Sequence, residues 1–246
     1  IVKLFPGKRF GIIVNDFGTI GVDAAVIKNS GSSIIHELNN GQIFCSCLSG
    51  SFIKTVSGYA GLDIDYLLVE TSGLAKPSSL LDILEGIKKT NGDRFTYCGM
   101  ITFVDASNYL KLSEVLNAVD EQIAYSDMVV LNKTDTVSAS ELSRIEMKIM
   151  TVKPDAGIIR TVYSKIDAST FLSLNKKGVV PGPDRRYGGW GVQGRPVPIL
   201  LKSSSPVSLS GLEKFCRDLQ GTFLRMKGYL NTDEGEVFAD CTFNEV

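Results

Sequence analysis

The sequence has little of what several common protein classes need. Lys and Arg number 26 and Asp and Glu 27, so the net charge is −1, which argues against binding nucleic acid or an anionic membrane through bulk positive charge. No run approaches the ~18 consecutive apolar residues of a membrane-spanning helix, and no basic stretch followed by an apolar one opens the chain, so we expect no signal peptide. Five Cys, an odd number in a chain of 246 residues, favour a reduced cytoplasmic compartment.

Short apolar runs follow one another through the first two thirds of the chain. They cover 10–14, 66–69, 100–104, 128–131 and 158–162, and helix-like stretches cover 77–89, 107–125 and 139–151. Runs that do not alternate with polar residues are typical of strands buried on both faces of a parallel sheet. The order of the elements therefore predicts an α/β fold with a doubly wound, mostly parallel sheet.

The composition changes after residue 172. A stretch over 173–196 is rich in Gly, Pro and Arg, which is typical of a linker. A strand-like run over 197–202, a helix over 209–219 and two strands over 222–230 and 236–242 follow. We therefore predict a domain over 1–172, a linker over 173–196 and a small α+β unit over 197–246.

Polar side chains stand where the apolar runs end, at Asn15, Asp16, Glu70, Asp105 and Asn132. A single polar residue at that position is an ordinary strand end. Several together favour a binding edge, because ligands of parallel α/β sheets bind at the carboxyl ends of the strands.

The most specific motif is Asn132-Lys133-Thr134-Asp135, directly after an apolar run. N-K-x-D at this place is typical of the loop that reads guanine in GTP-binding proteins. The Asp135 carboxylate can accept hydrogen bonds from the ring N–H and the exocyclic amine of guanine, a pair that adenine does not offer. Lys133 can lie across the base and Asn132 can tie neighbouring loops together. The alternative is a helix start with Asp135 as its cap.

Two further acidic motifs follow strands. Glu70-Thr71-Ser72-Gly73 is typical of a Walker-B-like element, in which Glu70 reaches a nucleotide-bound Mg²⁺ and the Gly73 amide senses the terminal phosphate. Asp16, in Asn15-Asp16-Phe17-Gly18, is positioned to approach Mg²⁺ or a catalytic water. A plain turn is the alternative for both motifs.

Cys45 and Cys47 lie one residue apart after a Gly-containing segment. Two such thiols can face one soft metal such as Zn²⁺, with further ligands from elsewhere, or they can be small buried side chains. The other cysteines, Cys98, Cys216 and Cys241, are far apart in the sequence, and we expect them to be isolated core residues.

In combination these motifs resemble the CobW-type GTPases, which are relatives of the nickel-enzyme maturation GTPases. The matching segments, in the family's order, are Asn15–Gly18, Gly21–Asp23, Glu37–Gly41, Glu70–Pro77, Val104–Ala106, Gln122–Asp127 and Asn132–Asp135. Ser164 and Lys165 loosely resemble the guanine-supporting loop of other GTPases, and Arg225–Gly228 resembles a strand of the family's second domain.

The resemblance implies a P-loop NTPase fold, with a GTP-binding domain over 1–172. It implies GTP and Mg²⁺ as cofactors, slow GTP hydrolysis, and Zn²⁺ or Co²⁺ as the metal handled. Asp16, Glu70 and Gly73 take the catalytic roles. Asn132, Lys133, Asp135 and Ser164 hold the guanine nucleotide. The client it implies is a metalloenzyme or a corrinoid-pathway protein.

The chain departs from the family pattern in three places. Of the family's C-x-C-C motif only Cys45 matches, with Cys47 added downstream. Asp16 and Thr19 stand where the family has two Glu, and G-x-x-x-x-G-K-[ST] does not occur in the sequence. We expect the missing strand and P-loop to precede Ile1 in the natural protein, and further strands to follow Val246. The alternative function is a metal-handling or protein-interaction module that does not hydrolyse nucleotide.

Overall fold

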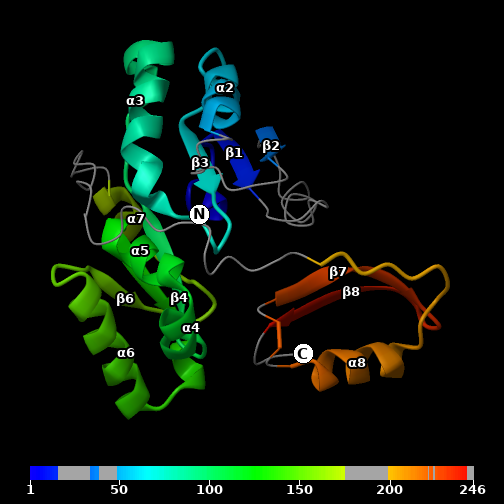
Figure 1. The fold of residues 1–246 in the computed structure, drawn as a ribbon. Coiled ribbons are helices and arrows are strands. Elements are labelled where there is room, and N and C mark those ends of the chain that lie inside the picture. The colour runs from blue at the N-terminus through cyan, green and yellow to red at the C-terminus, as the bar shows by residue number, and fades with distance from the viewer. Residues whose placement is uncertain (16–33, 39–48, 175–198, 221, 224, 243–246) are drawn as a thin grey trace. The chain divides into compact units, whose positions relative to one another are not determined.

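The computed structural model describes residues 1–15, 34–38, 49–174, 199–220, 222–223 and 225–242. The chain divides into two compact units, Ile1–Gly194 and Arg195–Val246 (Figure 1). Among the described residues no helix is long and apolar enough to cross a membrane.

The first unit alternates strands and helices along the chain. Its strands are β1 (Phe10–Asn15), β2 (Ile34–Leu38), β3 (Tyr66–Glu70), β4 (Ile101–Asp105), β5 (Met128–Asn132) and β6 (Ile158–Arg160). Its α-helices are α2 (Ser49–Tyr59), α3 (Leu80–Asn91), α4 (Tyr109–Val115), α5 (Asn117–Tyr125), α6 (Ala139–Val152) and α7 (Ala168–Ser173). Short 3₁₀ turns are η1 (Val2–Leu4), η3 (Pro77–Ser79), η4 (Gly92–Arg94) and η5 (Thr134–Thr136).

All six of these strands are paired in parallel, which confirms the predicted α/β class. They form two three-stranded sheets, in the orders β2-β1-β3 and β4-β5-β6. Among the described residues, β3 pairs only with β1 and β4 only with β5, so two sheets stand where one was expected. Tyr66 and Leu68 of β3 pack on a cluster that includes Met128 and Val130 of β5, and this apolar contact joins the two sheets.

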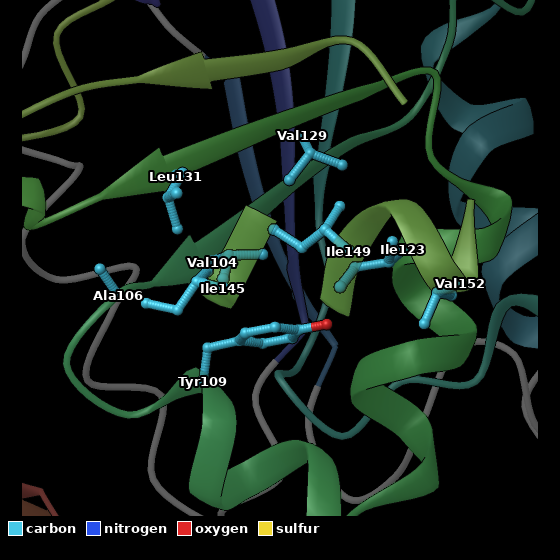
Figure 2. Close-up of a cluster of buried hydrophobic side chains, with 9 residues drawn as sticks. All are labelled: Val104, Ala106, Tyr109, Ile123, Val129, Leu131, Ile145, Ile149 and Val152. Carbon is cyan, nitrogen blue, oxygen red and sulfur yellow. The ribbon is translucent and has the colours of Figure 1, made fainter. Parts of the chain in front are cut away.

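Burial on both faces of the sheets explains why the apolar runs form strands. All six residues of β1 are buried, and so are the first four of β5, as expected for strands covered on both faces. Figure 2 shows Val104 of β4, Leu131 of β5 and Ile149 of α6 in one buried cluster. Burial of apolar side chains stabilises the fold by about 25 cal/mol per Å², so this cluster fixes where the polar ends of β4 and β5 lie.

The helix predicted over 107–125 is interrupted. Leu116 adopts an extended conformation (φ −126°, ψ 98°) between α4 and α5. After this break α5 makes side-chain hydrogen bonds to a segment distant in the sequence. The buried Glu121 carboxylate accepts a hydrogen bond from the Ser78 N–H at 2.9 Å, and Gln122 Nε2 donates to the carbonyl oxygens of Gly73 and Ala75 at 3.0 and 2.8 Å.

The second unit contains α8 (Leu209–Asp218) and the antiparallel hairpin β7 (Arg225–Thr232) and β8 (Gly235–Thr242). The strand predicted over 197–202 is wrong for its described part, since 199–202 form no strand and Ile199 is 79% exposed. Among the described residues no strand pairs with 199–202, and apolar residues without a partner strand do not make a strand.

The prediction for the three distal cysteines was partly wrong. Cys216 and Cys241 are buried, as expected, but Cys98 is exposed. Cys216 and Cys241 are also not isolated, because burial and a hydrogen bond with the Cys216 thiol together raise the pKa of Cys241 to about 11. A thiol with so high a pKa is protonated and unreactive at neutral pH.

Candidate nucleotide-binding site

The parallel register places the polar end of β4 beside that of β5. Asp105 is paired with Asn132, and the Ala106 N–H donates to the Asn132 carbonyl oxygen at 3.0 Å. Because both strands run in the same direction, these two residues lie at one carboxyl edge of the sheet, where α/β proteins bind ligands.

The Asn132 side chain holds the loop after β6 against the loop after β5. Its Oδ1 accepts a hydrogen bond from the Ser164 N–H at 2.8 Å. Thr134 adds two contacts to the same loop, because its N–H and its hydroxyl both donate to the Thr161 carbonyl oxygen, at 3.3 and 3.1 Å. The two loops are therefore one hydrogen-bonded structure, and Ser164 lies in it.

Lys133 is held by both its backbone and its side chain. Its backbone is left-handed (φ 56°, ψ 36°), a conformation that non-glycine residues seldom adopt. Its Nζ lies 3.2 Å from Asp105 Oδ2, and each of the two side chains is about one third exposed (32% and 31%). The ammonium group is thus placed at the sheet edge by a carboxylate of the neighbouring strand.

Asp105 is the centre of a small polar network. Its carboxylate accepts hydrogen bonds from the N–H and the hydroxyl of Ser107, at 2.9 and 2.6 Å, and from Asn108 Nδ2 at 3.2 Å. Burial acting alone raises the pKa of Asp105, but these hydrogen bonds and the charge of Lys133 outweigh it, so the pKa lies below its ordinary value of 3.8. Asp105 is therefore ionised at neutral pH.

We expect Asp105→Asn to destabilise the protein in a pH-dependent way. A carboxylate with a lowered folded-state pKa adds stability above its unfolded pKa, and this stability is lost as the pH falls through the folded-state pKa. The variant should lose about 1 kcal/mol of unfolding free energy at pH 7 and less at pH 3, measured by urea unfolding. Asp93→Asn is the matched control, because Asp93 pairs with Lys88 while 92% exposed. An equal loss at both pH values would contradict the charged role of Asp105.

Asp135 lies in η5 with an exposed side chain. Within the described part of the chain its carboxylate makes no hydrogen bond or ion pair. It also caps no helix there: the cap of α6 is Ser138, whose hydroxyl accepts a hydrogen bond from the Glu141 N–H at 3.2 Å. The helix-cap alternative for this motif was therefore wrong, and the carboxylate is available to a ligand.

The Glu70–Gly73 motif follows β3, at the carboxyl edge of the other sheet. Glu70 ends β3 in register with Val14 of β1. The turn after it is held by Ser72, whose hydroxyl accepts a hydrogen bond from the Leu74 N–H at 3.2 Å, and by the bond from Gln122 to the Gly73 carbonyl oxygen. The Glu70 side chain is exposed.

The remaining predicted residues, Asp16, Cys45 and Cys47, lie outside the described residues. Within the described ranges no group of three or more His, Cys, Asp and Glu side chains is arranged to hold a metal ion. The predicted metal ligands Cys45, Cys47 and Glu70 therefore remain a prediction.

Sequence reasoning missed part of what organises this edge. Asp105 was recognised as one of the polar strand ends that favour a binding edge and as part of the matching segment Val104–Ala106, but its contact with Lys133 was not predicted. Thr161 showed no signal, because its carbonyl oxygen becomes important only once the loops after β5 and β6 meet.

Parallel strands, a polar carboxyl edge and the Asn132–Asp135 loop define the class of α/β nucleotide-binding domains. The chain belongs to the family described as CobW/HypB/UreG, nucleotide-binding domain, whose model matches residues 1–160. This confirms the resemblance found in the sequence.

Curated relatives include proteins with metal-related names. A "Zinc chaperone CobW" of Sinorhizobium sp. is 30% identical over 172 residues, which are 58% of this chain and 48% of that protein. The "Zinc-regulated GTPase metalloprotein activator 1" of Schizosaccharomyces pombe is 26% identical over 190 residues, covering 70% and 44% of the two chains. The chain thus spans about half the length of these relatives.

The fold also resembles that of a solved structure, the Zn(II)-bound YjiA GTPase from Escherichia coli. The TM-score is 0.52 at 17% identity, over 99% of this chain and 83% of that one. At this identity the likeness supports the fold, and it agrees with the parallel α/β topology described above.

Proposed function

We propose that this chain binds guanine nucleotide at the carboxyl edge of β4 and β5, as part of a GTP-hydrolysing protein that handles a metal ion. The observation that carries the proposal is the joined loop pair, in which Asn132 binds the Ser164 N–H and Lys133 is held by Asp105. Family membership over residues 1–160 supports it, and so do the names of the zinc chaperone and GTPase relatives.

In this proposal each residue of the loop pair has a distinct task. The Asp135 carboxylate accepts the ring N–H and the exocyclic amine of guanine, because its exposed oxygens have no competing partner within the described residues. The Lys133 stem covers one face of the base. Asn132 keeps the Ser164 loop beside the base through the 2.8 Å bond to its N–H.

We place the terminal phosphate and Mg²⁺ at the carboxyl ends of β1 and β3. We propose that Glu70 and Asp16 serve Mg²⁺ or the attacking water and that the Gly73 amide senses the terminal phosphate. The hydrogen bonds from Gln122 to the 73–75 turn support this assignment, because they hold the turn in place after β3. Mg²⁺, when bound, offsets the negative charge that develops on the phosphate oxygens.

For the metal handled, we propose Zn²⁺, with Co²⁺ as the second choice, bound through Cys45 and Cys47. Thiolates suit zinc, and the relatives' names support the ion. The client is a metalloenzyme or a corrinoid-pathway protein, and hydrolysis is slow. Zn²⁺ titration of the full-length protein and of a Cys45→Ser, Cys47→Ser variant tests the ligands; equal affinities would remove both thiols from the site.

A comparison of GTP with ATP tests the nucleotide proposal. We expect the full-length protein to bind GTP at least about a hundredfold more tightly than ATP, because a site built to hydrogen-bond donors rejects a base that lacks them. Isothermal titration with both nucleotides and Mg²⁺ measures the ratio. Equal affinities would contradict base reading, and binding of neither would contradict the proposed function as a whole.

A further inference from the structure

Tyr163 and Ser164 form an unusual turn in the loop after β6. Both have positive φ, 55° and 52°, and the Lys165 N–H donates to the Val162 carbonyl oxygen at 3.3 Å across them. Two central residues with positive φ and this hydrogen bond are the features of a type I′ turn. Gly, Asn and Asp dominate such positions, because a Cβ atom crowds the following carbonyl oxygen there.

The surrounding contacts hold this turn in its strained form. Asn132 Oδ1 accepts the Ser164 N–H at 2.8 Å, and the Thr161 hydroxyl donates to the Lys165 carbonyl oxygen at 2.8 Å. The turn is therefore joined directly to the loop that carries Lys133 and Asp135. A strained backbone that its neighbours enforce is a frequent feature of ligand sites.

Packing of the Tyr163 side chain against the rest of the protein does little to offset this strain. It is 82% exposed, and no other large apolar side chain in the described residues exceeds that figure. Core packing therefore does not explain an aromatic residue at a position that glycine would occupy without strain. An exposed aromatic ring beside the loop that carries Lys133 and Asp135 is suited to stacking on a nucleobase, because every base offers a π-face to an aromatic ring.

We propose that Tyr163 is a nucleobase-binding residue that stacks on the guanine ring of the bound nucleotide. The inference rests on the proposed base-reading site and adds a residue to it. Lys133 and Tyr163 then contact the base through its faces, while Asp135 reads its edge. Since stacking does not depend on the groups at the edge of the base, Tyr163 contributes affinity and Asp135 contributes specificity.

The decisive variant is Tyr163→Gly, because strain relief and ring loss act on different measurements. Glycine accepts positive φ, so the midpoint of thermal unfolding should stay equal to that of the wild type or rise. Loss of the ring should weaken GDP binding by the full-length protein about tenfold or more, the range of base–aromatic stacking. Tyr163→Phe keeps the ring and should bind GDP within about twofold of the wild type. Tyr163→Asn, which also tolerates the turn, should behave like the glycine variant.

Three results would overturn the proposal. Unchanged GDP affinity in both Tyr163→Gly and Tyr163→Asn would show that the ring does not touch the base, as would be the case if it binds a protein client instead. A clear fall in the unfolding midpoint of Tyr163→Gly would show a structural role. Absence of GDP binding by the wild type would remove the base-reading site together with the stacking residue, whereas the first two results leave that site standing.

Discussion

Replacing Asp135 with Asn should transfer the preference of the full-length protein from guanine to xanthine nucleotides. The carboxylate accepts two N–H donors of guanine, whereas the amide offers one acceptor and one donor. The amide therefore opposes its own N–H to the exocyclic amine of guanine and suits the carbonyl that xanthine has there. Each hydrogen bond to a charged group is worth about 1.5–3 kcal/mol, so GDP affinity should fall about a hundredfold or more, as measured by isothermal titration with GDP and XDP.

The matched control for this change is Asp155→Asn. Asp155 is also an exposed aspartate of the first unit, 83% exposed and 3.6 Å from Lys153, and it lies outside the two loops of the site. This variant should bind GDP as the wild type does. If Asp135→Asn also kept the wild-type affinity for GDP and gained none for XDP, Asp135 would not read the base.

The second large effect concerns stability. Ile149 of α6 is fully buried (0% exposed) within the cluster drawn in Figure 2, which also contains Val104 and Leu131 at the ends of β4 and β5. Ile149→Ala removes buried methyl groups and leaves a cavity, a change that costs about 2–5 kcal/mol of unfolding free energy. Urea unfolding followed by circular dichroism measures the loss.

The next residue of the same helix provides the control. Met150 is 50% exposed, so Met150→Ala should change the unfolding free energy by no more than about 0.5 kcal/mol. Similar losses for the two variants would mean that α6 is not packed on the sheet as described. A selective loss for Ile149→Ala would show that α6 packs on the sheet through this cluster.

Several strands and helices were predictable from the local spacing of apolar residues. The strands β1 and β5 were predictable because their residues are apolar without alternation, and all but the last residue of β5 are buried. The helix α6 was predictable from its apolar spacing, and the structure ends it at Val152, one residue beyond the predicted end. The run over 197–202 shows the limit of such reasoning, since its described part begins with three apolar residues but has no partner strand among the described residues.

The candidate site was less predictable than these elements, because it depends on contacts between residues far apart in the sequence. The Asn132–Asp135 motif was visible in the chain, but its link to Asp105 and to the Tyr163–Ser164 turn was not. The interruption at Leu116 and the hydrogen bond from α5 to the turn after β3 were not visible in the sequence either. Backbone strain at Tyr163 also has no sequence pattern of its own, because tyrosine is an unusual residue for that turn.

The sequence by itself determined the α/β class, five of the six strands of the first unit and the family to which the chain belongs. Each depends on the identity and spacing of residues close together in the chain, and both can be read directly from the sequence. The tertiary structure alone decided that Lys133 is held by Asp105, that Asn132 binds the loop after β6, and that Tyr163 is exposed on a strained turn. These features require residues about 30 positions apart to meet, and parallel pairing of strands brings them to one edge.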